Sequence, residues 1–170
     1  MGVLYEHHPE MGGKQNRHHA RTEKHLPAGP RLVEPFAGSC AVMMATEYPH
    51  YLVADINSDL INLYKQIAFN CEKFIANAKG FFASTNSETS YYNIRQDFNH
   101  SSETTDFWKA VFFLYLNRHC YRGLCRYNRK GEFNVPYGNY KKHISRKTKS
   151  EHLQRKQNAP PSFVPATRKL

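Results

Sequence analysis

The segment from Arg31 to Asp55 constrains the fold of this chain more than any other. Arg31–Phe36 predicts a short buried strand that ends at a proline, and Tyr51–Asp55 predicts a second strand. Between them, Gly38 permits a tight turn, and the small residues up to Met44 begin a helix. A strand, a glycine turn, a helix and a strand make a βαβ unit, which joins parallel strands. The sequence therefore predicts an α/β fold with a parallel sheet.

The glycine turn has acidic residues on both sides. Asp55 follows Gly38 at close to the roughly 20-residue spacing at which a carboxylate in a βαβ unit accepts hydrogen bonds from ribose hydroxyls. The turn has one glycine instead of G-x-G-x-x-G, and Glu34 just before it would repel a pyrophosphate. The same charge would attract the sulfonium and amino groups of S-adenosylmethionine, so it favours a methyl donor over NAD. The alternative is an ordinary strand-to-helix connection with Asp55 as a capping residue.

The residues from Leu60 to Leu116 are expected to be mainly helical. Asn57 or Ser58 can cap a helix that begins near Asp59. Ser101 or Ser102 lies near the start of a later helix. The apolar residues of the later helix recur at helical spacing and are Phe107, Val111, Phe112, Tyr115 and Leu116.

Composition limits the class of protein and its partners. The formal net charge is +10, and clustered Lys and Arg favour polyanions through phosphate contacts. No apolar run approaches the roughly 18–20 residues that span a bilayer, and residues 1–10 do not form a secretion signal. We expect a cytoplasmic monomer without membrane partners. The four cysteines form no C-x-x-C pair and the histidines lack ligand spacing, so we expect reduced, mostly buried thiols and no metal.

Residues 117–142 combine cations, amides and aromatic rings. Asn128–Gly131 predicts a hairpin turn ahead of a short strand, Glu132–Val135. Arg can bond guanine bidentately, Asn can read adenine, Lys can hold phosphate and an aromatic ring can enter the base stack. This combination favours DNA, with a solvated basic loop as the alternative.

Several strings in Leu32–Lys142 resemble the Dam-type DNA adenine methylases. They are L-V-E-P-F-x-G, A-D-I-N-S-D-L-I, L-Y-L-N-R, G-L-C-R-Y-N and G-E-F-N-V-P-Y-G-x-Y-K-K. The resemblance implies a partial Rossmann-like methyltransferase core and a mainly helical target-recognition module with a short hairpin. It divides the chain into a degenerate N-terminal segment (1–30), an S-adenosylmethionine-binding part (31–70) and a recognition module (71–142). The tail (143–170) is basic and has few large apolar residues, so we expect it to be largely disordered.

The resemblance also assigns roles to particular residues. The residues expected to line the S-adenosylmethionine pocket are Lys14, Glu34, Pro35, Phe36, Gly38, Ser39 and Asp55. The residues expected to contact double-stranded DNA are Arg118, Tyr121, Arg122, Leu124, Arg126, Asn134, Pro136, Tyr140 and Lys141. Among them, Arg126 would read the guanine of GATC, and Tyr121 would intercalate where the target adenine is flipped out.

The sequence departs from the family pattern at four places. Cys40 and Ala41 replace a step that usually contains glycine, and Arg122 replaces a small amide. Gly12-Gly13-Lys14 is kept without the preceding tryptophan, and no D-P-P-Y or N-P-P-F string occurs. We therefore expect no catalytic residue in this chain, weak cofactor binding, and no methylation by this incomplete chain alone.

The sequence is also compatible with two other functions. One is a non-catalytic fragment that binds double-stranded DNA, and the other is a small basic RNA-binding or structural protein. A search for N6-methyladenine in GATC oligonucleotides incubated with the chain separates the enzyme from the fragment.

Overall fold

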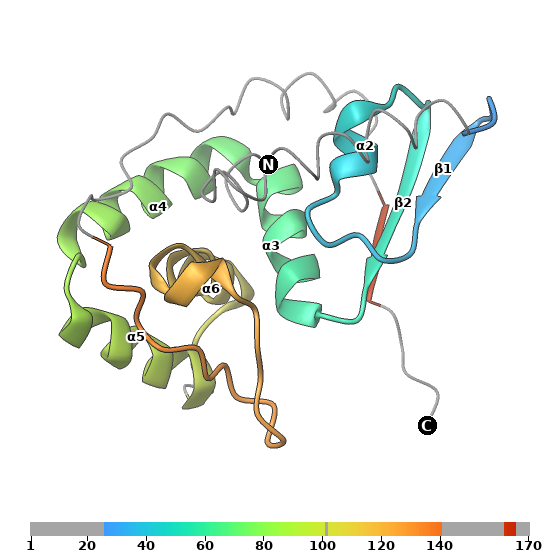
Figure 1. The fold of residues 1–170 in the computed structure, drawn as a ribbon. Coiled ribbons are helices and arrows are strands. Elements are labelled where there is room, and N and C mark those ends of the chain that lie inside the picture. Colours follow the sequence, from blue (N-terminus) through green and yellow to red (C-terminus); the bar gives the residue numbers. More distant parts are fainter. Residues whose placement is uncertain (1–25, 101, 141–161, 166–170) are drawn as a thin grey trace.

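A parallel three-stranded sheet forms one side of the molecule in the computed structural model, which describes residues 26–100, 102–140 and 162–165 (Figure 1). The strands are β1 (Arg31–Glu34), β2 (His50–Asp55) and β3 (Ser162–Pro165), in the order β1-β2-β3. Leu32 pairs with Tyr51, and Val53 pairs with Phe163. Helix α2 (Ala41–Ala45) lies between β1 and β2 in the chain, so the predicted βαβ unit is confirmed.

Strand β1 is shorter and less buried than the sequence predicts. It ends at Glu34 because Pro35, the next residue, has no N–H to continue a ladder. Leu32 is buried, whereas the side chain of Val33 is 53% exposed. Successive side chains of a strand point to opposite faces, so β1 contributes only one face to the core.

Within the tail that the sequence predicts to be largely disordered (143–170), residues 162–165 form strand β3, which corrects that expectation for these four residues, whereas residues 143–161 and 166–170 lie outside the described residues. Ser162–Pro165 pairs with β2 along its length, from Leu52 opposite Ser162 to Asp55 opposite Pro165. The pairing satisfies backbone groups of β2 that β1 cannot reach. A stretch poor in large apolar residues therefore still contributes a strand, because backbone hydrogen bonds along β2 favour its ordering.

Four longer helices follow the βαβ unit, as the sequence predicts for this region. They are α3 (Ser58–Phe69), α4 (Cys71–Ser84), α5 (Glu88–His100) and α6 (Asp106–His119). Asn57 caps α3 by accepting hydrogen bonds from the backbone N–H groups of Asp59 and Leu60. Helix α6 begins a few residues after Ser102, and its cap is Thr105, whose hydroxyl accepts a hydrogen bond from the Trp108 N–H.

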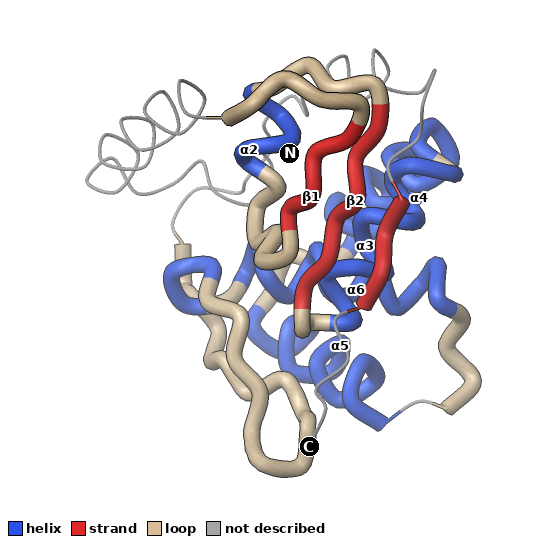
Figure 2. The backbone as a smooth tube through the Cα atoms, turned by 90° about the vertical axis from the view of Figure 1, so that its right-hand side faces the viewer, coloured by secondary structure: helices blue, strands red, loops and turns tan. Residues whose placement is uncertain are grey.

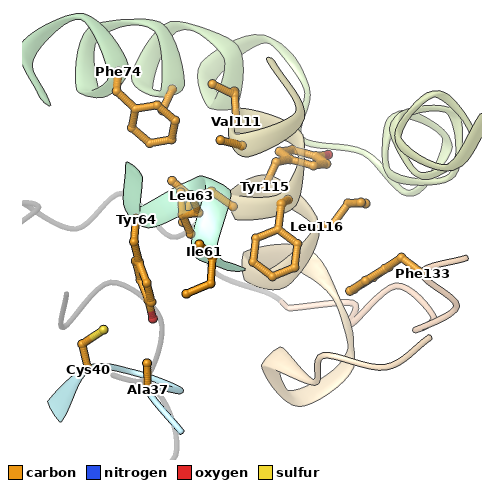
Figure 3. Close-up of a cluster of buried hydrophobic side chains, with 14 of the residues drawn as sticks. Ala37, Cys40, Ile61, Leu63, Tyr64, Phe74, Val111, Tyr115, Leu116 and Phe133 are labelled. Carbon is orange, nitrogen blue, oxygen red and sulfur yellow. The ribbon is translucent and has the colours of Figure 1, made fainter. Parts of the chain in front are cut away.

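Helix α6 lies at the centre of the helical layer. Five consecutive residues, 113–117, are buried, so the helix is covered on most of its sides. Helix α3 packs against α6 on one side and against β2 and β3 on the other. Figure 2 shows α3–α6 behind the sheet, and Figure 3 shows Tyr64 of α3 pointing toward Ala37 and Cys40. One core therefore extends from the sheet through α3 to the helices.

Within the described residues, none of the helices is both long and apolar enough to cross a membrane. All four thiols are free, and Cys40, Cys71 and Cys120 are buried while Cys125 is exposed.

Candidate functional site

The carboxyl ends of β1 and β2 bring two acidic side chains to the same edge of the sheet. Glu34 is the last residue of β1, and its carboxylate accepts hydrogen bonds from the N–H groups of Val42 (3.3 Å) and Met43 (3.1 Å) in α2. Asp55 is the last residue of β2, and its two oxygens accept from the Gly38 N–H (2.9 Å) and the Asn57 N–H (2.9 Å). Glu34 thus ties β1 to helix α2, and Asp55 ties β2 to the Gly38 turn and to the start of α3. Each acceptor oxygen also retains a second lone pair for a ligand.

Burial and hydrogen bonding act in opposite directions on Glu34. Burial raises the pKa of its carboxyl above the ordinary value, and the hydrogen bonds from Met43 and Val42 lower it. The N-terminal end of α2 therefore favours the charged form of the Glu34 carboxylate, whereas the exclusion of water around it disfavours that form.

The turn between β1 and α2 needs two residues with positive φ. Gly38 has φ +46°, which confirms its predicted role, and Cys40 has φ +51° with a fully buried side chain. The left-handed region favours glycine, so the position of Cys40 explains why the family pattern usually has glycine near this step. The Tyr64 hydroxyl of α3 donates a hydrogen bond to the Gly38 carbonyl and ties the turn to the helical layer.

The other expected cofactor residues lie at the surface of this turn. Phe36 is 90% exposed, Pro35 is exposed and Ser39 is half-buried. The turn thus presents an aromatic ring to solvent. Lys14 lies outside the described residues.

The predicted hairpin turn is present at Asn128–Gly131. The Gly131 N–H donates to the Asn128 carbonyl (3.0 Å), and the Asn128 side chain accepts from the N–H groups of Lys130 and Glu132. Tyr127 and Phe133 form one antiparallel bridge. The following residues, 132–135, do not continue as a regular strand, in contrast to the prediction.

Helix α5 explains why the hairpin does not continue as a ladder. Three of its side chains, Tyr91, Arg95 and Asn99, are spaced by four residues and share one face of the helix. Asn99 bonds both the N–H and the carbonyl of Phe133, while Tyr91 and Arg95 donate to the Val135 carbonyl. These three residues are not among those expected from the sequence, although polar groups at i, i+4 and i+8 of one helix are a usable signal.

Arg126 is held across the hairpin by Asn134. The guanidinium donates from Nε to the Asn134 side-chain oxygen (2.8 Å) and from Nη2 to the Asn134 carbonyl (3.1 Å). Arginine has five N–H donors, so three of them, including both on Nη1, stay available. Both side chains were predicted site residues, and the structure brings them together.

The remaining expected DNA contacts surround this hairpin. Tyr121 (46%), Leu124 (45%) and Tyr140 (42%) are exposed apolar or aromatic side chains. The Arg122 guanidinium lies over the Tyr121 ring, 5.2 Å from its centroid, and the Arg122 N–H donates to the Tyr140 hydroxyl (2.7 Å). Pro136 is exposed too.

Two expected DNA contacts do not belong to this exposed group. Arg118, near the end of α6, is half-buried. Lys141 lies outside the described residues.

The architecture defines a mixed α/β protein with a parallel sheet, consistent with part of a methyltransferase fold. Residues 11–162 match the D12 class N6 adenine-specific DNA methyltransferase family. The chain belongs to this family.

Individual relatives agree with the family match. The chain is 75% identical to the retron Ec67 DNA adenine methylase of Escherichia coli over 119 residues, which are 70% of this chain and 42% of that protein. It is 52% identical to the DNA adenine methylase of Serratia marcescens over 120 residues, 70% of this chain and 44% of that protein. It is 46% identical to the DNA adenine methylase of Escherichia coli K12 over 139 residues, 81% of this chain and 49% of that protein. The chain thus spans less than half the length of these relatives.

Proposed function

We propose that this chain carries the methyl-donor turn and the base-reading hairpin of an S-adenosylmethionine-dependent methyltransferase that modifies adenine N6 in GATC duplexes. The observation that carries the proposal is the pair of hydrogen bonds from the exposed Arg126 guanidinium to Asn134. These bonds orient Arg126 and leave adjacent N–H donors of the guanidinium available. A fixed arginine that presents two N–H groups matches the O6 and N7 acceptors of guanine. The family to which the chain belongs supports DNA as the substrate.

The residues around Arg126 suit the remaining tasks. Tyr121 and Leu124 expose apolar surface that can enter the base stack, which is needed because chemistry at an adenine amino group requires the base to leave the helix. Exposed Arg129 and Lys130 lie at the hairpin tip and can contact phosphates. Base reading and phosphate binding are thereby assigned to different side chains.

The turn at Gly38 has hydrogen-bond acceptors and negative charge that fit S-adenosylmethionine. The free lone pairs of Asp55 could accept hydrogen bonds from ribose hydroxyls, and the negative charge of Glu34 would attract the sulfonium and amino groups. The exposed ring of Phe36 can cover a flat or methylene surface of the ligand. When bound, the cofactor supplies the electrophilic methyl group.

Binding of duplexes tests the recognition assignment. Arg126→Ala should remove about 1–3 kcal/mol of preference for GATC over a scrambled duplex, because its bidentate contact distinguishes the base. Arg129→Ala removes the same charge three residues away and should weaken both duplexes equally, with a smaller salt slope. Fluorescence anisotropy titrations at several salt concentrations measure both quantities. Equal losses for the two duplexes with Arg126→Ala would show that Arg126 does not read sequence.

Calorimetric titration with S-adenosylmethionine tests the turn. Phe36→Ala should weaken binding by about 1–3 kcal/mol through lost stacking, with little effect on folding because the ring is exposed. Phe69→Ala is the matched control, since that ring is also exposed (65%) but lies at the far end of α3. An unchanged affinity in Phe36→Ala would remove Phe36 from the site.

A further inference from the structure

The N-terminal end of α3 is bonded directly to the hairpin that carries Arg126. The Tyr127 hydroxyl donates to the Asp59 carboxylate (2.7 Å) and also lies 3.4 Å from the Asn57 side-chain oxygen. The Asn57 amide donates to the Cys125 sulfur (3.0 Å). Cys125 and Tyr127 are the two neighbours of Arg126 in the chain, so the arginine is tethered on both sides.

Asn57 is itself fixed by the cofactor turn and the helix. Its backbone N–H donates to Asp55, whose other oxygen accepts from the Gly38 N–H. Its side-chain oxygen accepts from the first turn of α3. A continuous series of hydrogen bonds therefore runs from Gly38 through Asp55 and Asn57 to Cys125.

Tyr127 is suited to act as a permanent donor in this junction. Burial and the neighbouring Asp59 carboxylate raise the pKa of its hydroxyl well above the ordinary range. The ring packs edge-on against Phe133, with centroids 5.8 Å apart. The proton thus stays on the hydroxyl, and the ring fixes the direction in which it is donated.

We propose that Asn57 and Tyr127 are positioning residues that fix the recognition hairpin on α3 and thereby hold Arg126 at a defined place relative to the cofactor turn. The proposal rests on the proposed function of Arg126 and adds residues that act through it. Without the two tethers, the hairpin could shift relative to the sheet while the Arg126–Asn134 contacts inside it stay intact. Sequence discrimination would then decrease, whereas phosphate binding would persist.

A double-mutant cycle on the full chain tests this role. Tyr127→Phe removes one hydroxyl and should lower the ratio of affinities for GATC and scrambled duplexes by about threefold or more, with an unchanged salt slope. In the Arg126→Ala background, Tyr127→Phe should leave the ratio unchanged, because the residue that reads sequence is already absent. Tyr48→Phe is the matched control: its hydroxyl bonds the Pro27 carbonyl, away from the hairpin, and its loss should not change the ratio.

A second variant separates positioning from folding. Asn57→Ser keeps a residue able to cap α3 but is too short to donate to Cys125, so it should reproduce the loss of discrimination with an unfolding midpoint near that of the original protein. The positioning role alone would be overturned if the ratio of affinities for GATC and scrambled duplexes decreased in Arg126→Ala but was unchanged in both Tyr127→Phe and Asn57→Ser. A ratio that does not depend on Arg126 would overturn the proposed recognition function and this inference with it.

Discussion

Arg122 lies in the left-handed region, with φ +55° and ψ +20°. A side chain other than Gly, Asn or Asp adopts this region at a cost, which explains why a small amide is common at the corresponding place in the family pattern. Arg122 compensates in part by lying over the Tyr121 ring and donating its N–H to Tyr140. Arg122 therefore differs from the small amide of the family pattern in its preference for this backbone conformation as well as in its charge.

Replacing Arg122 tests this strain. Arg122→Asn should increase the free energy of unfolding by about 1 kcal/mol, because asparagine tolerates the left-handed conformation better. Urea denaturation with an unchanged m value measures the gain. Arg129→Asn makes the same charge change at an exposed hairpin position whose φ is not positive, and it should not stabilise. Equal effects of the two variants would attribute any gain to charge.

At the scale of elements, helix α5 supplies hydrogen-bond partners to the backbone of the hairpin, as a neighbouring strand does in a sheet. Asn99 bonds the N–H and the carbonyl of one residue, Phe133, which is the pattern of a paired strand residue. Phe133 and Val135 are buried beneath this face, so Asn134 between them projects toward Arg126 instead. The orientation of the Arg126–Asn134 pair is thus set by the docking of the hairpin on α5.

Loss of the hydrogen bonds between Asn99 and Phe133 should lower the stability of the fold. Asn99→Ala leaves two backbone groups of a buried residue without partners and should lower the free energy of unfolding by about 1–3 kcal/mol. Asn77→Ala, which removes a solvent-exposed bond to the Lys73 carbonyl, should change it by less than about 0.5 kcal/mol. Denaturant unfolding of both variants makes the comparison. Similar values for the two would mean that water replaces Asn99 at Phe133.

At the scale of the whole molecule, many ionisable groups are buried in their neutral form. Burial raises the pKa of Cys120 and of Tyr115 to about 12 each, and it raises the pKa of Cys40, Tyr64 and Tyr91 as well. In the unfolded chain these thiols and phenols lose their protons near pH 9.0 and 10.0. The unfolded state therefore binds fewer protons than the folded state above pH 9.0.

It follows that the free energy of unfolding decreases as the pH rises above about 9. Each group whose folded pKa exceeds the unfolded value contributes a loss of up to about 1.4 kcal/mol per pH unit between the two values. Urea midpoints should be constant near neutral pH and decrease from about pH 9 upward. Tyrosinate absorbance should increase together with the loss of circular dichroism, since these tyrosines ionise as they are exposed. Ionisation of Tyr115 and Tyr91 in a chain with native dichroism would contradict the prediction.

Local chemistry in the sequence was sufficient for much of the structure. The βαβ order, the Gly38 turn, the Asn57 cap and the turn at Asn128–Gly131 depend on residues close together in the chain, and each is confirmed. The family followed from the same short strings, and the family match bears it out. The roles of the individual cofactor and DNA residues stay predictions.

Contacts between distant residues decided what the sequence left open. Strand β3 forms because β2 offers unpaired backbone groups, and the basic tail itself carries no strong strand signal. The pairing of Arg126 with Asn134, the docking of Phe133 on α5 and the bond from Tyr127 to Asp59 each join residues that only folding brings together. Local propensity determines turns and caps, whereas the satisfaction of buried polar groups depends on partners that a single sequence does not reveal.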